Sequence, residues 1–109
     1  MESNILKIQQ LNDVFRKTFT DGKVLLTRGI SSLPQNEVLD IVHLVQTFNN
    51  FNLANDPYGE HDFGSFDYNG NTIFWKIDYY DNNYCFFSND PSSEGETKRV
   101  MTVMFASEY

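Results

Sequence analysis

The sequence has little of several things that commonly decide where a protein acts. Its 109 residues include one cysteine, Cys85, so an internal disulfide is excluded and a reducing compartment is expected. No apolar run approaches the roughly 20 residues of a membrane span. The N-terminus lacks the basic start and apolar stretch of a signal peptide. We therefore expect a soluble cytoplasmic protein that forms a single domain over residues 1–109.

Motifs that would name a reaction are also missing. The sequence contains no glycine-rich phosphate loop, no paired Cys/His spacing and no nucleophile elbow, so we predict neither a cofactor nor a metal site. Cys85 stands in an aromatic stretch without a neighbouring histidine, which favours a buried, inert thiol over a nucleophile. His43 lies beside the apolar stripe of a helical pattern, which favours a boundary residue over a ligand.

Basic residues are scarce, eight against 15 acids, and the net charge of −7 is unevenly distributed. Residues 56–81 carry six acids against Lys76 alone, a net of −5, whereas residues 1–55 balance five acids with five bases. A phosphate-binding surface needs the opposite sign, so direct binding of nucleic acid is not expected. The acids indicate a protein partner with a basic surface or a bound cation; the alternative is that they only keep the chain soluble.

Large apolar residues are abundant, and their spacing predicts two helices. They recur at three- and four-residue steps in two segments: Ile5, Ile8, Leu11, Phe15 and Phe19 in the first, and Val38, Ile41, Val42, Val45 and Phe48 in the second. The stretch 32–35, Ser-Leu-Pro-Gln, has the pattern of a capping box before the second segment. Between the helices, residues 23–27 predict a short strand.

Asn69-Gly70, between two alternating runs, is the strongest hairpin signal in the chain. A two-residue turn there places Tyr68 opposite Asn71 and sets the register of both strands. One face of the hairpin should then pack on the helices, and it holds Phe66, Tyr68, Ile73, Trp75, Ile77 and Tyr79. The other face is mixed and holds His61, Phe63, Ser65, Asp67, Thr72, Phe74, Lys76, Asp78 and Tyr80.

Two further strands are predicted after the hairpin, at residues 84–87 and 99–106. The second is apolar on both faces, which suits a central strand. We therefore expect an α+β fold in which two N-terminal helices pack on one face of a mostly antiparallel sheet, in the order α-β-α-β-β-β-β.

The segment 55–64, Asn-Asp-Pro-Tyr-Gly-Glu-His-Asp-Phe-Gly, concentrates chemistry-bearing groups in a turn that leads into a strand. The hairpin register sets His61 opposite Asp78, where a carboxylate could orient the imidazole as a general base. The alternative is a cross-strand charge pair that only fixes the register. The candidate catalytic residues are His61, Asp78 and Glu60, and the candidate binding residues are Asp56, Tyr58, Asp62, Asp67, Lys76 and Asp81.

Several blocks of the sequence carry a resemblance to a known family. They are residues 11–13, 26–30, 55–66, 74–81 and 99–104 together with Glu108-Tyr109, and they span nearly the whole chain. With them the chain resembles a family of small bacterial proteins of unknown function that occur on plasmids and other mobile elements. The resemblance implies a mobile-element setting, in which small acidic proteins often act against host defence, and it implies no reaction.

Two functions are predicted from these observations. The first is an interaction protein without catalytic activity, an acidic inhibitor of a basic, nucleic-acid-binding defence complex. The second is a small hydrolase or ligand-binding domain that uses the turn Glu60-His61-Asp62 with Asp78. A buried His61 with both nitrogens bonded to backbone or side chains would instead make the turn a structural clasp.

Overall fold

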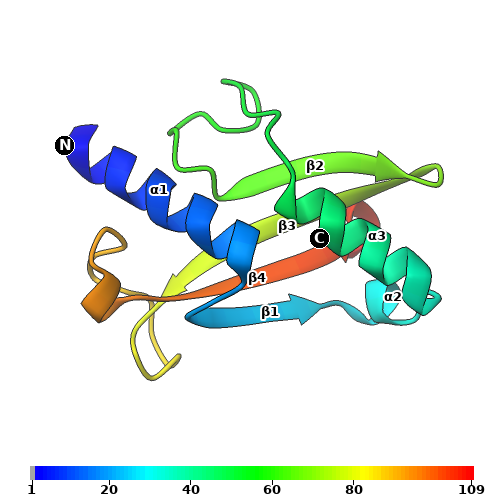
Figure 1. The fold of residues 1–109 in the computed structure, drawn as a ribbon. Coiled ribbons are helices and arrows are strands. Elements are labelled where there is room, and N and C mark those ends of the chain that lie inside the picture. Colours follow the sequence, from blue (N-terminus) through cyan, green and yellow to red (C-terminus); the bar gives the residue numbers. More distant parts are fainter. Residues whose placement is uncertain (1) are drawn as a thin grey trace.

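Two layers, helices above a sheet, make up the computed structural model, which describes residues 2–109 and the side chains from Asn4 onward (Figure 1). The elements follow in the order α1 (Glu2–Thr18), β1 (Gly22–Leu26), α2 (Arg28–Ser31), α3 (Gln35–Gln46), β2 (Phe63–Tyr68), β3 (Asn71–Tyr80), η1 (Glu94–Glu96), β4 (Lys98–Phe105) and η2 (Ala106–Glu108). The predicted α+β class with N-terminal helices is confirmed.

The four strands form one mixed sheet in the order β1-β4-β3-β2. β4 is central, as predicted from its apolar faces, and it pairs antiparallel with β3 and parallel with β1. The Asn69-Gly70 turn also forms as predicted, with positive φ at both residues and Tyr68 opposite Asn71. A Cβ at Gly64 would overlap the indole Nε1 of Trp75 across the strands, so this close approach requires glycine.

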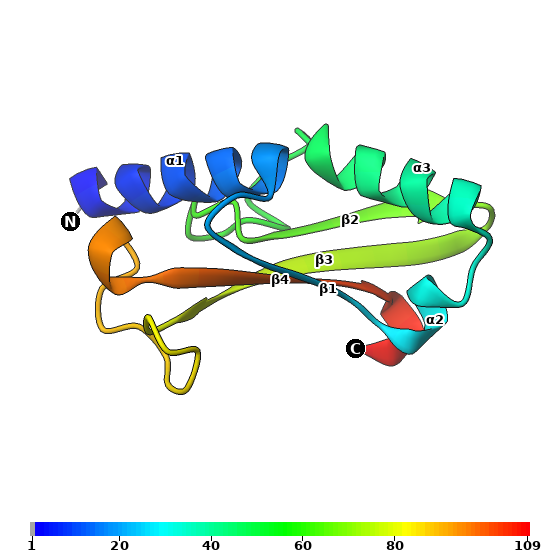
Figure 2. The same cartoon turned by 60° about the horizontal axis from the view of Figure 1, so that its bottom comes forward.

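α1 and α3 cover one face of the sheet, and the core lies between these layers (Figure 2). Ile73, Trp75 and Ile77 of β3 are buried there, which confirms the face predicted from their alternation. α3 contributes Ile41 and Val45, both fully buried, while Leu39 on its outer side is exposed. The helical periodicity of this segment therefore identified the buried stripe correctly.

α1 packs differently from its predicted apolar stripe. Its three buried residues are Asn12, Phe15 and Arg16, whereas Ile5 is 37% exposed. Two of the three residues that this helix buries are therefore polar, and polar groups are buried only where partners satisfy them. These partners come from the loop between α3 and β2.

Three local predictions are wrong. Residues 84–87 form a turn with one isolated bridge, between Tyr80 and Phe87, in place of a strand. Cys85, expected to be buried, is exposed in that turn. The capping box does not form either, because Ser32 donates to the carbonyl of Arg28 at the end of α2 and α3 starts without a side-chain cap. The short helix α2 was not predicted.

The C-terminal turn η2 is tied back to the start of α2. The carboxylate of Glu108 accepts hydrogen bonds from the Thr27 hydroxyl (2.6 Å), the Gly29 amide (3.0 Å) and the Phe105 amide (2.8 Å). These bonds, the one from Thr27 first, lower the pKa of Glu108. Three donors on one side chain tie the chain end to the start of α2.

Candidate functional site

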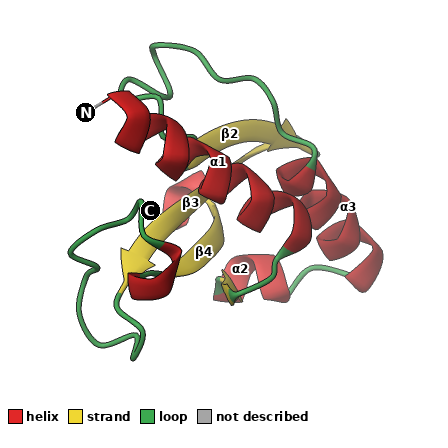
Figure 3. Cartoon of the chain, turned by 60° about the vertical axis from the view of Figure 1, so that its left-hand side comes forward, coloured by secondary structure: helices red, strands yellow, loops and turns green. Residues whose placement is uncertain are grey.

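The loop at 49–62, which contains the predicted site, lies against α1 (Figure 3). Gln9 donates to the carbonyl of Gly59 and Asn12 donates to the carbonyl of Glu60, both at 2.9 Å. Asn52 and Asn55 hold the first half of the loop, since each accepts backbone N–H bonds within it. The Asn-rich stretch therefore forms hydrogen-bonded turns, as these side chains favour.

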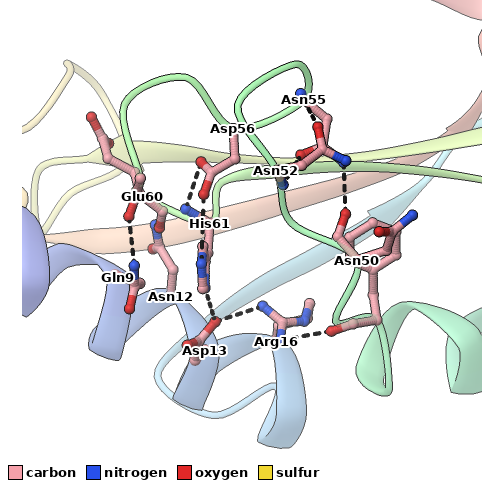
Figure 4. A network of polar contacts seen from close by, with 12 residues as sticks. Gln9, Asn12, Asp13, Arg16, Asn50, Asn52, Asn55, Asp56, Glu60 and His61 are labelled. Atoms are coloured by element: carbon pink, nitrogen blue, oxygen red, sulfur yellow. Dashed lines mark hydrogen bonds and ion pairs between the residues drawn. The ribbon is translucent and has the colours of Figure 1, made fainter.

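His61 sits at the centre of this docked loop (Figure 4). Its backbone adopts a left-handed conformation, with φ at 57°, and its amide donates to the Asp56 carboxylate at 3.1 Å. Its ring lies between two carboxylates, with Nδ1 at 2.9 Å from Asp13 and Nε2 at 3.5 Å from Asp56. Only an imidazolium has an N–H on both nitrogens, so the ring can donate to both carboxylates only when it is protonated.

The face of the His61 ring is covered as well as its edges. Phe51 stacks on it in parallel, with ring centroids 3.7 Å apart, and 20% of the His61 side chain remains exposed. A ring with both nitrogens facing carboxylates and one face stacked has little freedom to turn toward a substrate. The contacts of both ring nitrogens are those expected for the structural clasp, while the side chain is partly and not fully buried.

Arg16 extends the same network into the core. It donates to Asp13 at 2.9 Å and to the carbonyl of Phe48 at 3.1 Å, and its guanidinium lies 5.2 Å from the ring centroid of Phe51 and 5.4 Å from that of Trp75. With the Arg16 side chain 2% exposed, the charge is compensated by Asp13 and by these aromatic faces. Asp13 is thus shared between Arg16 and His61.

A second polar network is built around Asn12, which is fully buried. Its amide donates to the Tyr79 hydroxyl at 2.8 Å, and its carbonyl oxygen accepts from Nε of Arg99. Tyr79 in turn donates to the Glu60 carboxylate at 2.7 Å. Burial first, and then the bond to Glu60, hold the pKa of Tyr79 well above its usual range. Burial also lowers the pKa of Arg99.

The predicted contact between His61 and Asp78 is wrong. β2 begins at Phe63, so the left-handed backbone at His61 takes this residue out of the ladder and toward α1. Asp78 alternates with the buried Ile77 and therefore points to the opposite face of the sheet. There it forms an ion pair with Lys76. The predicted register of β2 against β3 is correct, but the ladder ends at Phe63 and Lys76, two residues before His61 and Asp78.

The remaining predicted site residues are scattered over the molecule. Asp56 is buried beside His61 and Tyr58 is 77% exposed on the loop. Burial, and then the nearby Glu60, raise the pKa of Asp62. Asp67 bonds to Thr72 near the hairpin tip, whereas Asp81 accepts the amides of Asn83 and Cys85 beyond the far end of β3. The acids of residues 56–81 therefore do not form one continuous surface.

A pocket of about 730 Å³ opens between the ends of α1 and α3 and includes both histidines of the chain. Its ionisable lining residues are Asp13, Arg16, Lys17, His43 and His61. Arg16 and Lys17 lie in the last turn of α1, and His43 lies in the last turn of α3. Basic residues are favoured there by the carbonyl ends of the helices, which explains this lining without a ligand. In the described part of the chain, no cluster of three metal-ligating residues occurs.

The face of the sheet that points away from α1 and α3 has a different character. Its side chains, by the strand register, are Lys23 and Leu25 of β1, Phe63, Ser65 and Asp67 of β2, Thr72, Phe74, Lys76, Asp78 and Tyr80 of β3, and Lys98, Val100, Thr102 and Met104 of β4. Phe63 packs edge-on against Phe74, and Phe74 against Tyr109. At the other end Tyr80 contacts Phe87. We call these residues the open face.

Sequence reasoning missed the residues that α1 supplies to the networks, chiefly Asn12 and Arg16. A signal existed. Gln9, Asn12, Asp13 and Arg16 follow one another at helical steps of three, one and three, and such spacing marks one face of a helix. The stripe runs beside the apolar one, and its amides and charges are those that dock the loop.

The chain matches one known protein family. A family model described as "Protein of unknown function (DUF3768)" matches residues 26–108. The chain belongs to this family. The matched range includes the docked loop, all of β2 to β4, and Glu108. No curated protein and no solved structure matches the chain. Among the described residues, no helix is long and apolar enough to cross a membrane.

Proposed function

We propose that this protein is an interaction module that binds a protein partner through the open face of its sheet. The observation that carries the proposal is the composition of that face. An antiparallel sheet with one solvated face normally presents polar residues there, whereas on this face the aromatic residues Phe63, Phe74 and Tyr80 stand among the polar ones. In the described chain, both long helices lie on the other side (Figure 2).

Exposure at several points of this face supports an interface. Leu25 is 50% exposed, and Phe87 and Tyr109, which pack on the face from its two ends, are 73% and 79% exposed. Exposed apolar side chains on one face of a small protein are one mark of an interaction site. Aromatic residues are also the side chains that contribute most to interfaces.

A basic partner is still proposed, but the acids that would contact it lie in a different part of the molecule from the one predicted. Exposed acids gather at the end of the molecule where β3 ends and β4 begins, among them Asp90, Glu94 and Glu96. Asn82 bonds to the carbonyl of Gly95, which holds the two acidic loops of this end together. An inhibitor of a basic, nucleic-acid-binding defence complex, encoded on a mobile element, would present this end to its target.

The hydrolase alternative also stays a prediction, with a specific difficulty. A general base needs its orienting carboxylate within hydrogen-bond reach, and Asp78 lies on the other face of the sheet from His61. The carboxylates that do flank His61, Asp13 and Asp56, belong to the contacts that dock the loop. A catalytic role for the turn would therefore have to coexist with its role in holding the loop.

A pair of matched substitutions tests the interaction proposal. Leu25→Lys places a charge on the open face, whereas Leu39→Lys places one on the outer side of α3, at 50% and 60% exposed positions respectively. Tagged variants are compared by affinity purification from the native host with quantitative mass spectrometry. We expect a partner retained by wild type and Leu39→Lys and lost with Leu25→Lys. A partner lost only with Leu39→Lys would contradict the proposal.

A further inference from the structure

The turn at 81–88, next to one end of the open face, presents two strongly exposed apolar residues. Phe86 and Phe87 are 74% and 73% exposed. The turn that presents them is well defined, since Asp81 accepts two backbone amides, Tyr84 has a φ of 58°, and the amide of Asp81 donates to the carbonyl of Phe86. The two rings are therefore held outward by a hydrogen-bonded turn and not by a flexible tail.

A pocket of about 260 Å³ lies beside this turn on the open face. It is lined by Leu25, Tyr80, Tyr84 and Val100 together with Lys23. The Lys23 ammonium lies 4.0 Å from the centroid of the Tyr84 ring, so its charge is directed to the aromatic rim. A pocket of this size and lining accepts one apolar side chain. One partner could therefore contact the exposed rings of Phe86 and Phe87 and also place a side chain in the pocket.

The charge around the turn decides what kind of partner fits. From residue 77 to residue 97 the chain has five acids, Asp78, Asp81, Asp90, Glu94 and Glu96, and no lysine or arginine. The nearby Lys98 is paired with Asp21, and Lys7 lies 3.9 Å from Glu94. Asp78 is paired with Lys76, and Lys23 lines the pocket. The excess of negative charge near the exposed rings therefore comes from the acids of residues 81–96, and it attracts a cationic surface and repels an anionic lipid membrane.

We infer that the docking site formed by Phe86, Phe87 and the pocket beside Tyr84 receives a cationic segment of a protein partner, with one of its apolar side chains in the pocket. This inference rests on the proposed function, because it specifies the chemistry of the partner for the same face. Apolar contact with the two rings supplies the affinity, and Asp90, Glu94 and Glu96 select lysine- or arginine-rich segments and speed their association.

A selection from a random 12-residue peptide library displayed on phage, with the full chain as bait, tests the inference. We expect the enriched peptides to combine lysine or arginine with an aromatic or large aliphatic residue. Their affinity, measured with synthetic copies by fluorescence anisotropy, should fall on the order of thirtyfold in Phe86→Ser/Phe87→Ser. It should fall about tenfold in Asp90→Lys/Glu94→Lys/Glu96→Lys and weaken as salt rises.

Asp67→Lys is the matched control, since it reverses an exposed acid near the hairpin tip, at the far end of β3, and should leave binding unchanged. Suppose that the enriched peptides bind Leu25→Lys less tightly than wild type, but are acidic or bind Asp90→Lys/Glu94→Lys/Glu96→Lys with unchanged affinity. That result would overturn the inference and leave the proposed function standing. Enriched peptides that are indifferent to Leu25→Lys as well, or no enrichment at all, would contradict both. Binding of the protein to phosphatidylglycerol vesicles would replace a protein partner by a membrane and overturn the inference too.

Discussion

The two sides of the sheet use their residues in opposite ways. On the helix side, the segment around His61 looks like a catalytic site in sequence, yet the carbonyls of Gly59 and Glu60 and the ring of His61 are engaged in holding a loop on α1. On the open face, by contrast, Leu25, Phe87 and Tyr109 are at least half exposed. The comparison shows that reactive residue types indicate function only when their hydrogen-bonding capacity is not already used by the fold.

The largest expected effect on the helix side comes from removing the hub of the buried network. Asn12→Ala should lower the free energy of unfolding by about 3 kcal/mol, because it leaves the buried Arg99 and the carbonyl of Glu60 without this partner. Urea denaturation followed by tryptophan fluorescence measures the change. Gln10→Ala, at an exposed position of the same helix, is the control and should change stability by less than about 0.5 kcal/mol.

Two substitutions at His61 separate the effect of backbone strain on stability from the effect of the side-chain contacts. His61→Ala should cost about 2 kcal/mol through loss of the carboxylate and stacking contacts. His61→Gly should cost about 1 kcal/mol less, because the backbone at this position is left-handed. Equal losses in the two variants would show that the positive φ carries no strain. A variant as stable as wild type would contradict the clasp.

A smaller effect with a definite pH dependence is expected at Asp62. Its pKa is raised in the folded state, so ionisation of this carboxyl disfavours folding at neutral pH. Asp62→Asn should therefore raise the free energy of unfolding at pH 7, by less than about 1 kcal/mol because the side chain is partly solvated. The gain should decline as pH falls through the raised pKa and vanish below about 3.8, the ordinary value. Urea titrations at pH 3 and pH 7 compare the two limits.

The smallest effect on stability is expected where the proposed function lies. Phe86→Ser should change the free energy of unfolding by less than about 0.5 kcal/mol, because its side chain is 74% exposed and buries little on folding. The same denaturation assay measures it. A loss of 2 kcal/mol or more would mean that the turn at 81–88 stabilises the fold, and the contrast between the two sides of the sheet would disappear.

Much of the fold was predictable because its signals are local. The hairpin register follows from Asn69-Gly70, and the buried stripe of α3 follows from helical periodicity. The parallel pairing of β1 with β4 was not predictable, since it joins residues about 77 positions apart, such as Gly22 and Arg99, with no sequence pattern of their own. The turn at residues 84–87 was missed because aromatic residues favour strands even where Asp81 caps a turn.

The site was predictable only in part. The segment 55–64 was correctly singled out as a place where polar groups converge, but the partners of His61 come from α1 and from Asp56, and neither the hairpin register nor the local sequence indicated them. The positive φ of His61 determines which residues it contacts, because this left-handed conformation turns its ring to the helix side of the sheet. Histidine adopts that conformation more readily than most residues, yet no pattern in the sequence announces it.

The most direct test of the account is a binding titration of His61→Ala with a peptide selected on the open face, run alongside its denaturation curve. The account predicts that His61→Ala binds the peptide with the affinity of wild type while it unfolds at a lower urea concentration. Leu25→Lys should show the reverse, with near wild-type stability and lost binding. A His61→Ala variant that is as stable as wild type but no longer binds would place the function at the turn and contradict the account.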